Sequence, residues 1–359
     1  MTSSAIISNA KYPLRQLGKN GPFVSAIGLG TMGVRTPWYG KMNSDADTFT
    51  ALSYAADRGV TFWDCADSYG QSEAALGRWF THTGRRADIF LASKFGYTNL
   101  ATPMATPTPT PDSTPSYIRT ALARSLDQLQ TTYIDLYYQH RVDPSVPIEV
   151  VLETLRPHLE AGTIRWLGLS ECSSETLRRA KAVKGVGEKV IAVQMEYSAF
   201  TLDIEKSGFA KVAEELGVSV VAYSPLARGM VTGTQRSRDD FAPTDARLRL
   251  PRYSAENFSK NLVLADAIAA IASTHSLTAA QVALAWILAE HPGWVPIPGS
   301  SSVARIEENA KAAQVVLPED AIREITRLAD NAEVAGERNF AIVDGDCIAY
   351  DAWKGEGSI

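Results

Sequence analysis

The chain contains 359 residues, of which 45% are hydrophobic and 21% are charged, as in ordinary globular proteins. A chain of this length can bury a large core, and single α/β barrels commonly reach this size. Its formal net charge of -5 at pH 7 gives no reason to expect nucleic acid or an anionic membrane as a partner.

Cysteine usage and the N-terminal sequence bear on the compartment. Three cysteines, Cys65, Cys172 and Cys347, are too few and too scattered for a metal-binding cluster or a disulfide framework, so a reducing compartment is the simpler interpretation. The first dozen residues lack the basic start and apolar core of a secretory signal. No apolar run approaches the roughly 20 residues of a membrane span. We therefore expect a soluble, cytoplasmic protein with a loose N-terminal tail.

The first elements are a hairpin, a short strand and a helix. Residues 14–28 form two extended arms around Lys19-Asn20-Gly21, which is a strong hairpin turn signal. The second arm leads into a strand that ends near Gly30. Residues 43–58 carry a capping sequence and an apolar stripe at helical spacing, so we expect a helix there.

The next three strands end in side chains that can do chemistry. An extended apolar run over 60–63 ends in Asp64, and Tyr69 follows five residues later beside a glycine. Later strands end in Lys94 and His140. A helix over 72–80 begins after Tyr69, and we interpret its Glu73 as a charge in the first helical turn rather than as a catalytic acid.

Strands and helices alternate along the remainder of the chain. Expected helices cover 148–161, 174–183, 204–216, 261–275 and 279–291, and expected strands cover 164–170, 190–194 and 218–224. The eight expected strands end near Gly30, Asp64, Lys94, His140, Ser170, Gln194, Tyr223 and Pro298. We therefore predict a (β/α)8 barrel over about 12–330, in a single domain 1–359 with a tail at 331–359. An open doubly wound sheet is the alternative, but no G-x-G-x-x-G loop opens a first βα unit.

Three segments are expected to shape a pocket at the barrel mouth. Residues 97–115 are rich in Thr and Pro, which cannot pack a core, and we expect a loop over the mouth because the strand-helix alternation resumes at once. Residues 228–253 form a long polar segment, and the tail at 331–359 follows the last helix. The tail contains Phe340, Tyr350 and Trp353, aromatic side chains that we expect to pack over the mouth.

The strand-end residues make one plausible site, because the carboxyl ends of parallel barrel strands converge. A phenol has a reference pKa of about 10, a nearby ammonium favours the phenolate, and a carboxylate can hold that ammonium in place. An imidazole can orient a substrate carbonyl. Such a phenol can protonate an oxygen as a hydride arrives at the attached carbon. Taken singly, each of these residues is more often a solvated loop residue, a helix cap or a turn.

The order and spacing of these residues resemble the aldo-keto reductase superfamily over nearly the whole chain. The matching motifs are residues 64–70, Ser93-Lys94 and residues 136–140, and residues 138–144, 168–171 and 250–253 are typical of its perakine-reductase-like branch. The resemblance implies NADPH-dependent reduction of a small-molecule aldehyde or ketone, without a metal. It also implies the catalytic roles: Tyr69 supplies the proton, Lys94 lowers its pKa, Asp64 orients Lys94, and His140 steers the carbonyl oxygen.

The resemblance further implies a set of residues that bind NADPH/NADP+. Ser170 and Gln194 match positions that bind the nicotinamide carboxamide, and Tyr223 matches the aromatic residue that stacks on its ring. The full set is Gly30, Thr31, Ser170, Gln194, Tyr223, Ser224, Pro225, Leu226, Arg228, Ser300, Ser302, Arg305, Glu308 and Asn309. Two positions depart from many relatives: Glu171 stands in place of Asn, and Gly299 in place of Lys.

The turn at 300–302 has a physical reason to bind a phosphate. A serine-rich turn that opens a helix presents free backbone N–H groups and the positive end of the helix dipole. Arg305, in the first turns of that helix, can contact a 2′-phosphate through two hydrogen bonds. The simpler alternatives are that Ser300 or Ser302 only caps the helix and that Arg305 is a surface charge.

Two alternative functions are compatible with a barrel. The first is a nicotinamide-binding regulatory or channel-partner subunit with little turnover, since a fold alone does not determine function. Such a subunit has less need to retain all four catalytic residues. The second is a metal-dependent hydrolase, which is disfavoured because no further histidine falls at an expected strand end.

Overall fold

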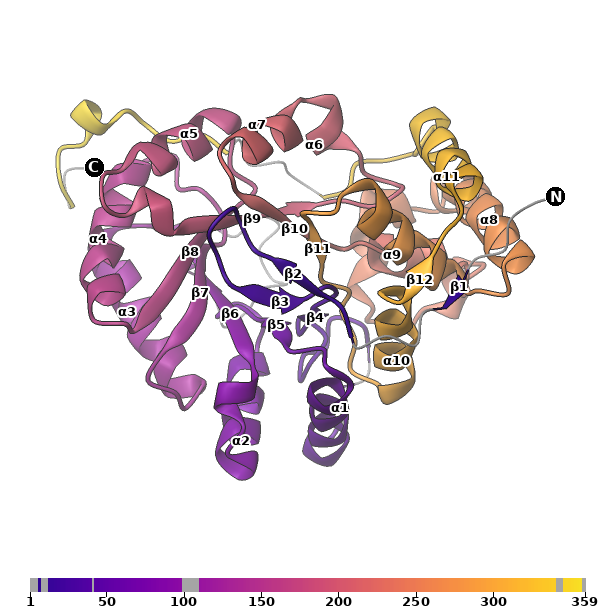
Figure 1. Cartoon of the computed structure of the whole chain (residues 1–359), viewed down its shortest axis with the longest axis horizontal. Helices are drawn as coiled ribbons and strands as arrows, with labels where there is room; N and C mark the ends of the chain where they lie inside the picture. The colour runs from indigo at the N-terminus through magenta and orange to yellow at the C-terminus, as the bar shows by residue number, and fades with distance from the viewer. Residues whose placement is uncertain (1–5, 8–11, 41, 99–109, 340–344, 357–359) are drawn as a thin grey trace.

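The computed structural model describes residues 6–7, 12–40, 42–98, 110–339 and 345–356 (Figure 1). Eight parallel strands form one sheet in sequence order. They are β4 (Leu29–Gly30), β5 (Phe62–Asp64), β6 (Phe90–Phe95), β7 (Ile134–Gln139), β8 (Ile164–Ser170), β9 (Val190–Glu196), β10 (Ser219–Tyr223) and β11 (Val295–Pro296).

The two edges of this sheet meet and close it. Gly30 of β4 pairs with Gly299 in a parallel bridge, and its backbone N donates to the carbonyl of Pro298 at 3.1 Å. A Cβ on Gly30 would lie 2.8 Å from the carbonyl oxygen of Ile297, so the close approach of the strands needs a glycine here. The predicted (β/α)8 barrel is confirmed.

Helices surround the sheet in Figure 1. They are α1 (Asp45–Arg58), α2 (Ser72–Thr83), α3 (Pro115–Gln128), α4 (Ile148–Glu160), α5 (Ser174–Ala182), α6 (Asp203–Lys206), α7 (Phe209–Glu215), α8 (Phe258–Thr274), α9 (Ala279–Glu290), α10 (Val303–Ala312) and α11 (Glu319–Asn331). Local signals set their ends. In α1, for example, Ser44 caps the first turn by accepting a hydrogen bond from the backbone N of Asp47.

The prediction of one continuous helix over residues 204–216 is wrong. Residues 204–216 form two short helices, α6 and α7, instead of one. The break falls at Gly208, whose φ of 78° lies in the left-handed region that ends a helix. The apolar periodicity continues across this break, so periodicity alone did not reveal it.

A hairpin covers the end of the barrel where the strands begin. It consists of β2 (Leu14–Gln16) and β3 (Phe23–Ser25), which lie across the barrel in Figure 1. The backbone N of Gly18 in its turn donates to Oγ of Ser219, the first residue of β10. The predicted hairpin is confirmed, and the carboxyl ends of the strands are left for the site.

The N-terminal tail is partly ordered by pairing. Strand β1 (Ile6–Ile7) pairs antiparallel with β12 (Val315–Val316), which lies between α10 and α11. The expectation of a loose tail is therefore wrong for these two residues.

The segment after β10 is built from short helical turns rather than from an irregular loop. These are η3 (Ala227–Thr232), η4 (Arg238–Asp240), η5 (Ala246–Arg249) and η6 (Pro251–Tyr253). Tyr253 is buried, and its hydroxyl donates to the carbonyl of Ala227 at 2.8 Å. This hydrogen bond ties the far end of the segment to its beginning.

The C-terminal tail follows the rim of the barrel mouth. The backbone N of Ser173, just before α5, donates to Gly345 O at 2.9 Å, and the N of Ile348 donates to Pro144 O at 3.1 Å, shortly before α4. Farther along, the backbone N of Ser116 in the first turn of α3 donates to Glu356. Helices that follow barrel strands begin on the mouth side, so these contacts place the tail along that side.

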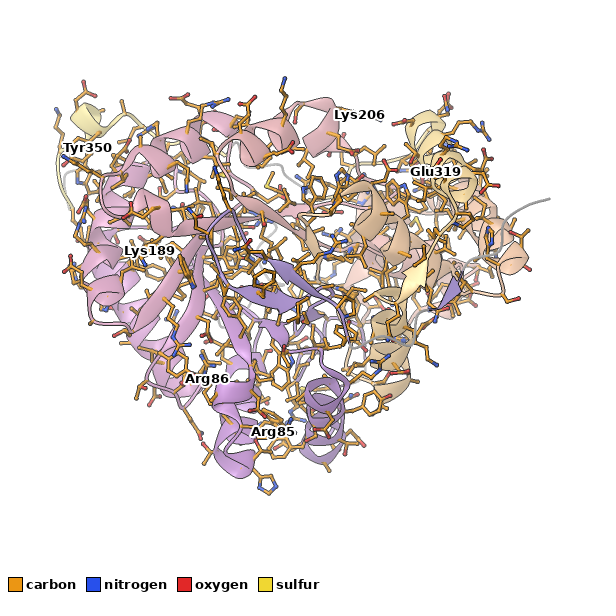
Figure 2. The ribbon with its side chains drawn as sticks, viewed as in Figure 1. Arg85, Arg86, Lys189, Lys206, Glu319 and Tyr350 are labelled. Atoms are coloured by element: carbon orange, nitrogen blue, oxygen red, sulfur yellow. The ribbon has the colours of Figure 1, made fainter. Side chains whose placement is uncertain are left out.

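One aromatic residue of the tail, Tyr350, does not form part of the cover that we expected. Tyr350 is 61% exposed, and Figure 2 shows it at the periphery of the molecule. Trp353 is partly buried and packs against the main hydrophobic core. Phe340 lies outside the described residues, as do residues 99–109 of the loop predicted at 97–115.

Among the described residues, no single helix is both long and apolar enough to cross a membrane. Helices α8 and α9 meet these criteria only as a pair, and the pair is bent by 89°.

We expect Gly168→Ala to destabilise the protein, because Gly168 of β8 faces the packed barrel interior. A Cβ at this position would lie 2.3 Å from Cε1 of Tyr138 and 3.0 Å from the carbonyl oxygen of Ala192. Overpacking of this kind costs about 1–3 kcal/mol or more of unfolding free energy. Urea unfolding measures the loss. The matched control is Gly293→Ala, whose added Cβ meets no atom within 4 Å. Equal unfolding midpoints for the two variants would contradict this account of the interior.

Candidate active site

The four side chains predicted from strand ends lie together at the mouth. Asp64 ends β5 and Lys94 lies in the next strand, β6, while Tyr69 and His140 follow β5 and β7. Lys94 Nζ donates to Asp64 Oδ1 at 2.5 Å and lies 3.4 Å from the hydroxyl oxygen of Tyr69. The rings of Tyr69 and His140 meet edge to face, with their centroids 5.8 Å apart.

Lys94 and Asp64 form a buried ion pair. The side chain of Lys94 is 0% exposed and that of Asp64 is 2% exposed. Lys94 Nζ also donates to the carbonyl of Cys65 at 2.7 Å, and Gln194 Nε2 donates to the second oxygen of Asp64 at 2.7 Å. Burial raises the pKa of Asp64, and the charge and hydrogen bonds of Lys94 and Gln194 act against that rise.

Tyr69 carries its proton at neutral pH. Burial and the nearby Asp64 carboxylate hold the pKa of Tyr69 well above its usual value, while the Arg141 guanidinium acts in the opposite direction. This differs from the expectation that Lys94 makes the phenol more acidic, because burial and the Asp64 carboxylate both raise the pKa of Tyr69 and outweigh the Arg141 guanidinium. The ammonium at 3.4 Å is still in place to stabilise a phenolate once the proton has left.

His140 is a neutral imidazole. Burial, together with the charges of Lys94 and Arg141, holds the pKa of His140 well below its usual value. Its Nδ1 lies 3.4 Å from Oγ of Ser68, and its ring packs against Tyr97 with centroids 5.0 Å apart. A neutral imidazole has one N–H that can donate to a carbonyl oxygen.

Two buried carboxyl groups behind this cluster were not foreseen as part of it. Glu73 is only 5% exposed and accepts a hydrogen bond from Oγ of Ser93 at 2.6 Å, so it is more than a charge in a helical turn. Asp67 accepts from Arg124 at 2.9 Å, and burial with the charge of Glu73 raises the pKa of Asp67 to about 7. The strand alternation gave no signal for either residue.

Three residues assigned to the nicotinamide lie on neighbouring strands, and each already has a partner. Ser170 ends β8, Gln194 lies in β9 and Tyr223 ends β10. Gln194 is hydrogen-bonded to Asp64, as described above. Oγ of Ser170 accepts from Arg141 at 3.3 Å, and the hydroxyl of Tyr223 accepts from Arg338 at 3.1 Å. Sequence reasoning identified neither arginine as part of the site.

The loop from Ser224 to Arg228, which includes Pro225 and Leu226, has an unusual backbone. Ser224, Ala227 and Arg228 have φ values of 50°, 48° and 54°, in the left-handed region. Non-glycine residues in sparsely populated regions cost about 1–3 kcal/mol each and persist where the surrounding structure holds them. Arg228 is held in this way, since it donates to the carbonyl of Arg338 at 2.8 Å.

The helix that was expected to bind a phosphate begins as predicted. Ser302 is the N-cap of α10 and accepts from the backbone N of Arg305 at 3.4 Å, while its predicted contact with a phosphate stays a prediction. Ser300 is buried, and its backbone N donates to Gly30 O at 3.3 Å. Arg305 is exposed, and Glu308 beyond it is half-buried.

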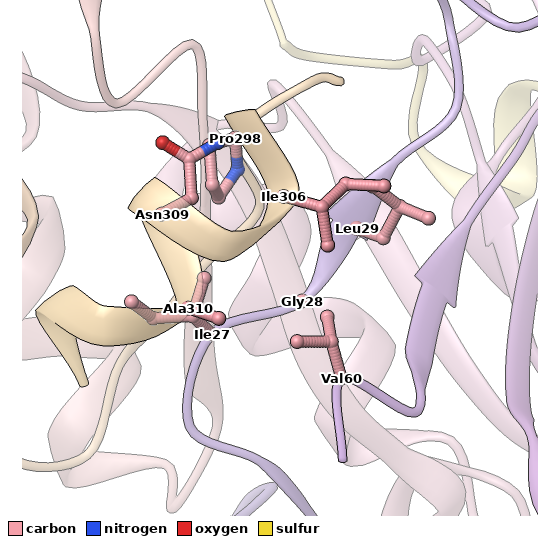
Figure 3. Close-up of a pocket in the computed structure, with 8 residues that line it drawn as sticks. All are labelled: Ile27, Gly28, Leu29, Val60, Pro298, Ile306, Asn309 and Ala310. Atoms are coloured by element: carbon pink, nitrogen blue, oxygen red, sulfur yellow. The ribbon is translucent and has the colours of Figure 1, made fainter. Parts of the chain in front are cut away.

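The remaining assigned residues support the framework. Thr31 is fully buried, and its hydroxyl donates to the carbonyl of Asp64 at 2.8 Å. Asn309 lies in a small, mostly apolar pocket between α10 and β4, together with residues such as Leu29, Pro298 and Ile306 (Figure 3). This pocket is separate from the cluster around Lys94.

This chain is similar in sequence to known proteins. The model of the Aldo/keto reductase family matches residues 26–330. Aldo-keto reductase str7 of Strobilurus tenacellus is 43% identical over 333 residues, which cover 91% of this chain and 95% of that protein. Aldo-keto reductase yakc of Schizosaccharomyces pombe, whose name includes NADP(+), is 44% identical over 330 residues, which cover 91% of this chain and 94% of that protein.

Solved structures of aldo-keto reductases share the fold of this chain. The holo form of aldo-keto reductase AKR11C1 from Bacillus halodurans superposes with a TM-score of 0.70 at 25% identity, covering 91% of this chain and 98% of that one. The thermostable aldo-keto reductase Tm1743, solved with the inhibitor epalrestat, also has a TM-score of 0.70, at 27% identity, covering 88% of this chain and 99% of that one. The perakine-reductase-like branch stays a prediction. Because the matched region spans the barrel and the relatives align over most of their length, this chain belongs to the Aldo/keto reductase family.

Proposed function

We propose that this chain is an NADPH-dependent reductase of aldehydes or ketones in which Tyr69 is the proton donor. One observation carries the proposal. The protonated phenol of Tyr69 lies 3.4 Å from an ammonium that is fully buried and anchored by a carboxylate. That arrangement holds a proton donor at neutral pH and stabilises the anion that forms when the proton leaves.

Each residue of the cluster has a distinct task. The cofactor supplies the hydride chemistry, and the barrel contributes binding and placement. Tyr69 gives its proton to the substrate oxygen, and Lys94 stabilises the resulting phenolate. Asp64 keeps Lys94 in place by the 2.5 Å ion pair. Neutral His140 donates a hydrogen bond that orients the carbonyl oxygen beside the phenol.

The residues present fit an NADP-type dinucleotide. Ser170, Gln194 and Tyr223 end neighbouring strands and offer polar groups and an aromatic face for a nicotinamide. Arg305 is exposed in the first turn of α10 and is free to meet a phosphate. The NADP(+) in the name of the Schizosaccharomyces pombe relative supports this choice of cofactor.

Domain organisation and compartment belong to the same proposal. We infer a single domain with a small-molecule carbonyl substrate, and a cytoplasmic location. Cys65, Cys172 and Cys347 are free thiols, and the first two are buried, which fits a reducing compartment. A regulatory subunit with little turnover is less well supported, because it has less need of the complete Asp64, Tyr69, Lys94 and His140 set.

Tyr69→Phe should separate binding from chemistry. Without the phenol proton, we expect turnover to fall by a factor of about 100 or more, as for the loss of a positioned general acid. NADPH affinity should stay within a few-fold, since the phenol acts on the substrate oxygen. NADPH oxidation with a panel of aldehydes and ketones measures turnover, and fluorescence titration measures affinity. Tyr133→Phe, a tyrosine flanked by Arg86 and Arg165, is the control. Near wild-type kcat in Tyr69→Phe would show that another group is the acid.

Arg305 should discriminate NADPH from NADH. A charge-assisted, two-point contact contributes about 1.5–3 kcal/mol, so we expect Arg305→Ala to weaken NADPH binding roughly ten- to a hundred-fold. NADH binding should hardly change, because NADH has no 2′-phosphate. Arg323→Ala removes another exposed arginine, on α11, and serves as the control. Equal losses for both cofactors would mean that Arg305 acts on the structure of α10 instead.

Lys94 and Asp64 should act as one unit. Lys94→Met removes the cation beside the phenol, and Asp64→Asn leaves that cation without its counter-charge. Either change disables the same function, so the double variant should lose far less kcat/KM than the product of the single losses. A double-mutant cycle with one good aldehyde tests this, with folding checked by circular dichroism. If the loss of kcat/KM in the double variant equals the product of the two single losses, Asp64 is a purely structural residue.

A further inference from the structure

Arg338 of the C-terminal tail reaches the ends of three neighbouring strands. Its guanidinium pairs with the carboxylate of Glu171, directly after β8, through both terminal nitrogens. Nη1 also lies 3.3 Å from a carboxylate oxygen of Glu196, the last residue of β9. The same nitrogen donates to the hydroxyl of Tyr223 at the end of β10, at 3.1 Å. Arg338 is 9% exposed, so these contacts are almost closed to solvent.

Glu171 is held in a strained position by these contacts. Its φ is 52°, in the left-handed region that a residue with a side chain rarely occupies. Its Oε1 accepts from the backbone N of Glu196 at 3.0 Å in addition to Arg338. Burial disfavours the ionised carboxylate, but the hydrogen bond from Arg338 and the charge of Arg141 outweigh it and lower the pKa of Glu171. The carboxylate is therefore charged and fixed in direction.

The acidic residue at this position needs a cation close by. The side chains of Glu171 and Glu196 are only 9% and 1% exposed, so their charges have little water to stabilise them. Arg338 is the residue that pairs with both. A neutral amide in place of Glu171 would need no counter-charge. Glu171 and the arginine in the tail therefore form one interaction.

The backbone of the tail is held at the same point. Arg228, in the strained loop after β10, donates to the carbonyl of Arg338 at 2.8 Å and to Oδ1 of Asn339 at 3.0 Å. Arg228 Nη2 also lies 3.5 Å from Glu196. The loop and the tail therefore hold each other against the ends of β9 and β10.

We propose that Arg338 is a positioning residue that binds the C-terminal tail to the nicotinamide end of the site and fixes Glu171 and Tyr223 there. This inference rests on the proposed function, because it takes these strand ends as the nicotinamide site. Arg338 meets Tyr223 at the hydroxyl, which leaves the ring face for stacking. Glu171, fixed by Arg338, presents a carboxylate that accepts a hydrogen bond from a carboxamide NH₂.

Arg338→Met tests the proposal through binding and tail protection. We expect NADPH to bind about ten-fold or more weakly in fluorescence titration, as for the loss of charge-assisted hydrogen bonds. Without cofactor, backbone hydrogen exchange of residues 345–356 should be faster than in the wild type. The control is Arg179→Met. Arg179 holds the same tail through Cys347 O at 3.0 Å and Ile348 O at 2.8 Å, away from the strand ends. The Arg179→Met substitution should speed the hydrogen exchange of residues 345–356 and leave NADPH affinity unchanged.

A second substitution that restores NADPH affinity distinguishes a positioning role of Arg338 from general destabilisation of the protein. Glu171→Gln in the Arg338→Met background removes the unpaired carboxylate and should recover several-fold of the lost affinity. Arg338→Lys, which keeps the charge and the fold, should give an intermediate loss. Unchanged NADPH affinity in Arg338→Met, or failure of Glu171→Gln to recover any affinity, would overturn this inference alone. A wild-type protein that binds no NADPH would instead overturn the proposed function together with it.

Discussion

The buried ion pair between Lys94 and Asp64 is the interaction on which the site depends. Both side chains are removed from water, and loss of either partner would leave a buried charge at a cost of about 3–5 kcal/mol. The barrel makes the pair possible because β5 and β6 are adjacent and in register, with Asp64 opposite Ala92 and Lys94 two residues farther along. Tyr69 then needs only the short turn after β5 to reach the ammonium. The position of the Tyr69 hydroxyl beside Lys94 is therefore a consequence of strand register.

The barrel and the positions of Asp64, Tyr69, Lys94 and His140 could be predicted because both rest on local patterns. Strand and helix periodicities are readable over short windows, and the carboxyl ends of parallel strands converge by geometry. A residue that ends an apolar run, such as Asp64 or Lys94, is placed at the mouth by that rule alone. The same reasoning placed Ser170, Gln194 and Tyr223 on neighbouring strands.

What could not be predicted depends on contacts between distant segments. Arg338 and Glu171 are 167 residues apart, and nothing near either residue in the chain signals the other. The burial of Glu73 depends on packing of α2 against Ser93 in β6. The break at Gly208 is a backbone event inside an apolar pattern that continues unchanged. Tertiary contacts decide the first two cases, and the backbone conformation of one glycine decides the third, which the apolar periodicity does not reveal.

Several polar groups at the mouth are paired with one another. Gln194 binds Asp64, Arg141 binds Ser170, and Arg338 binds Tyr223. Such a network holds the strand ends rigid, because an unpaired polar group in a low-dielectric site is costly. It also means that a dinucleotide gains only the difference between its own hydrogen bonds and those that it replaces. The choice among ligands then depends on contacts that a ligand can make without breaking these existing pairs. In the proposed cofactor site, the ring of Tyr223 and the exposed guanidinium of Arg305 would make such contacts.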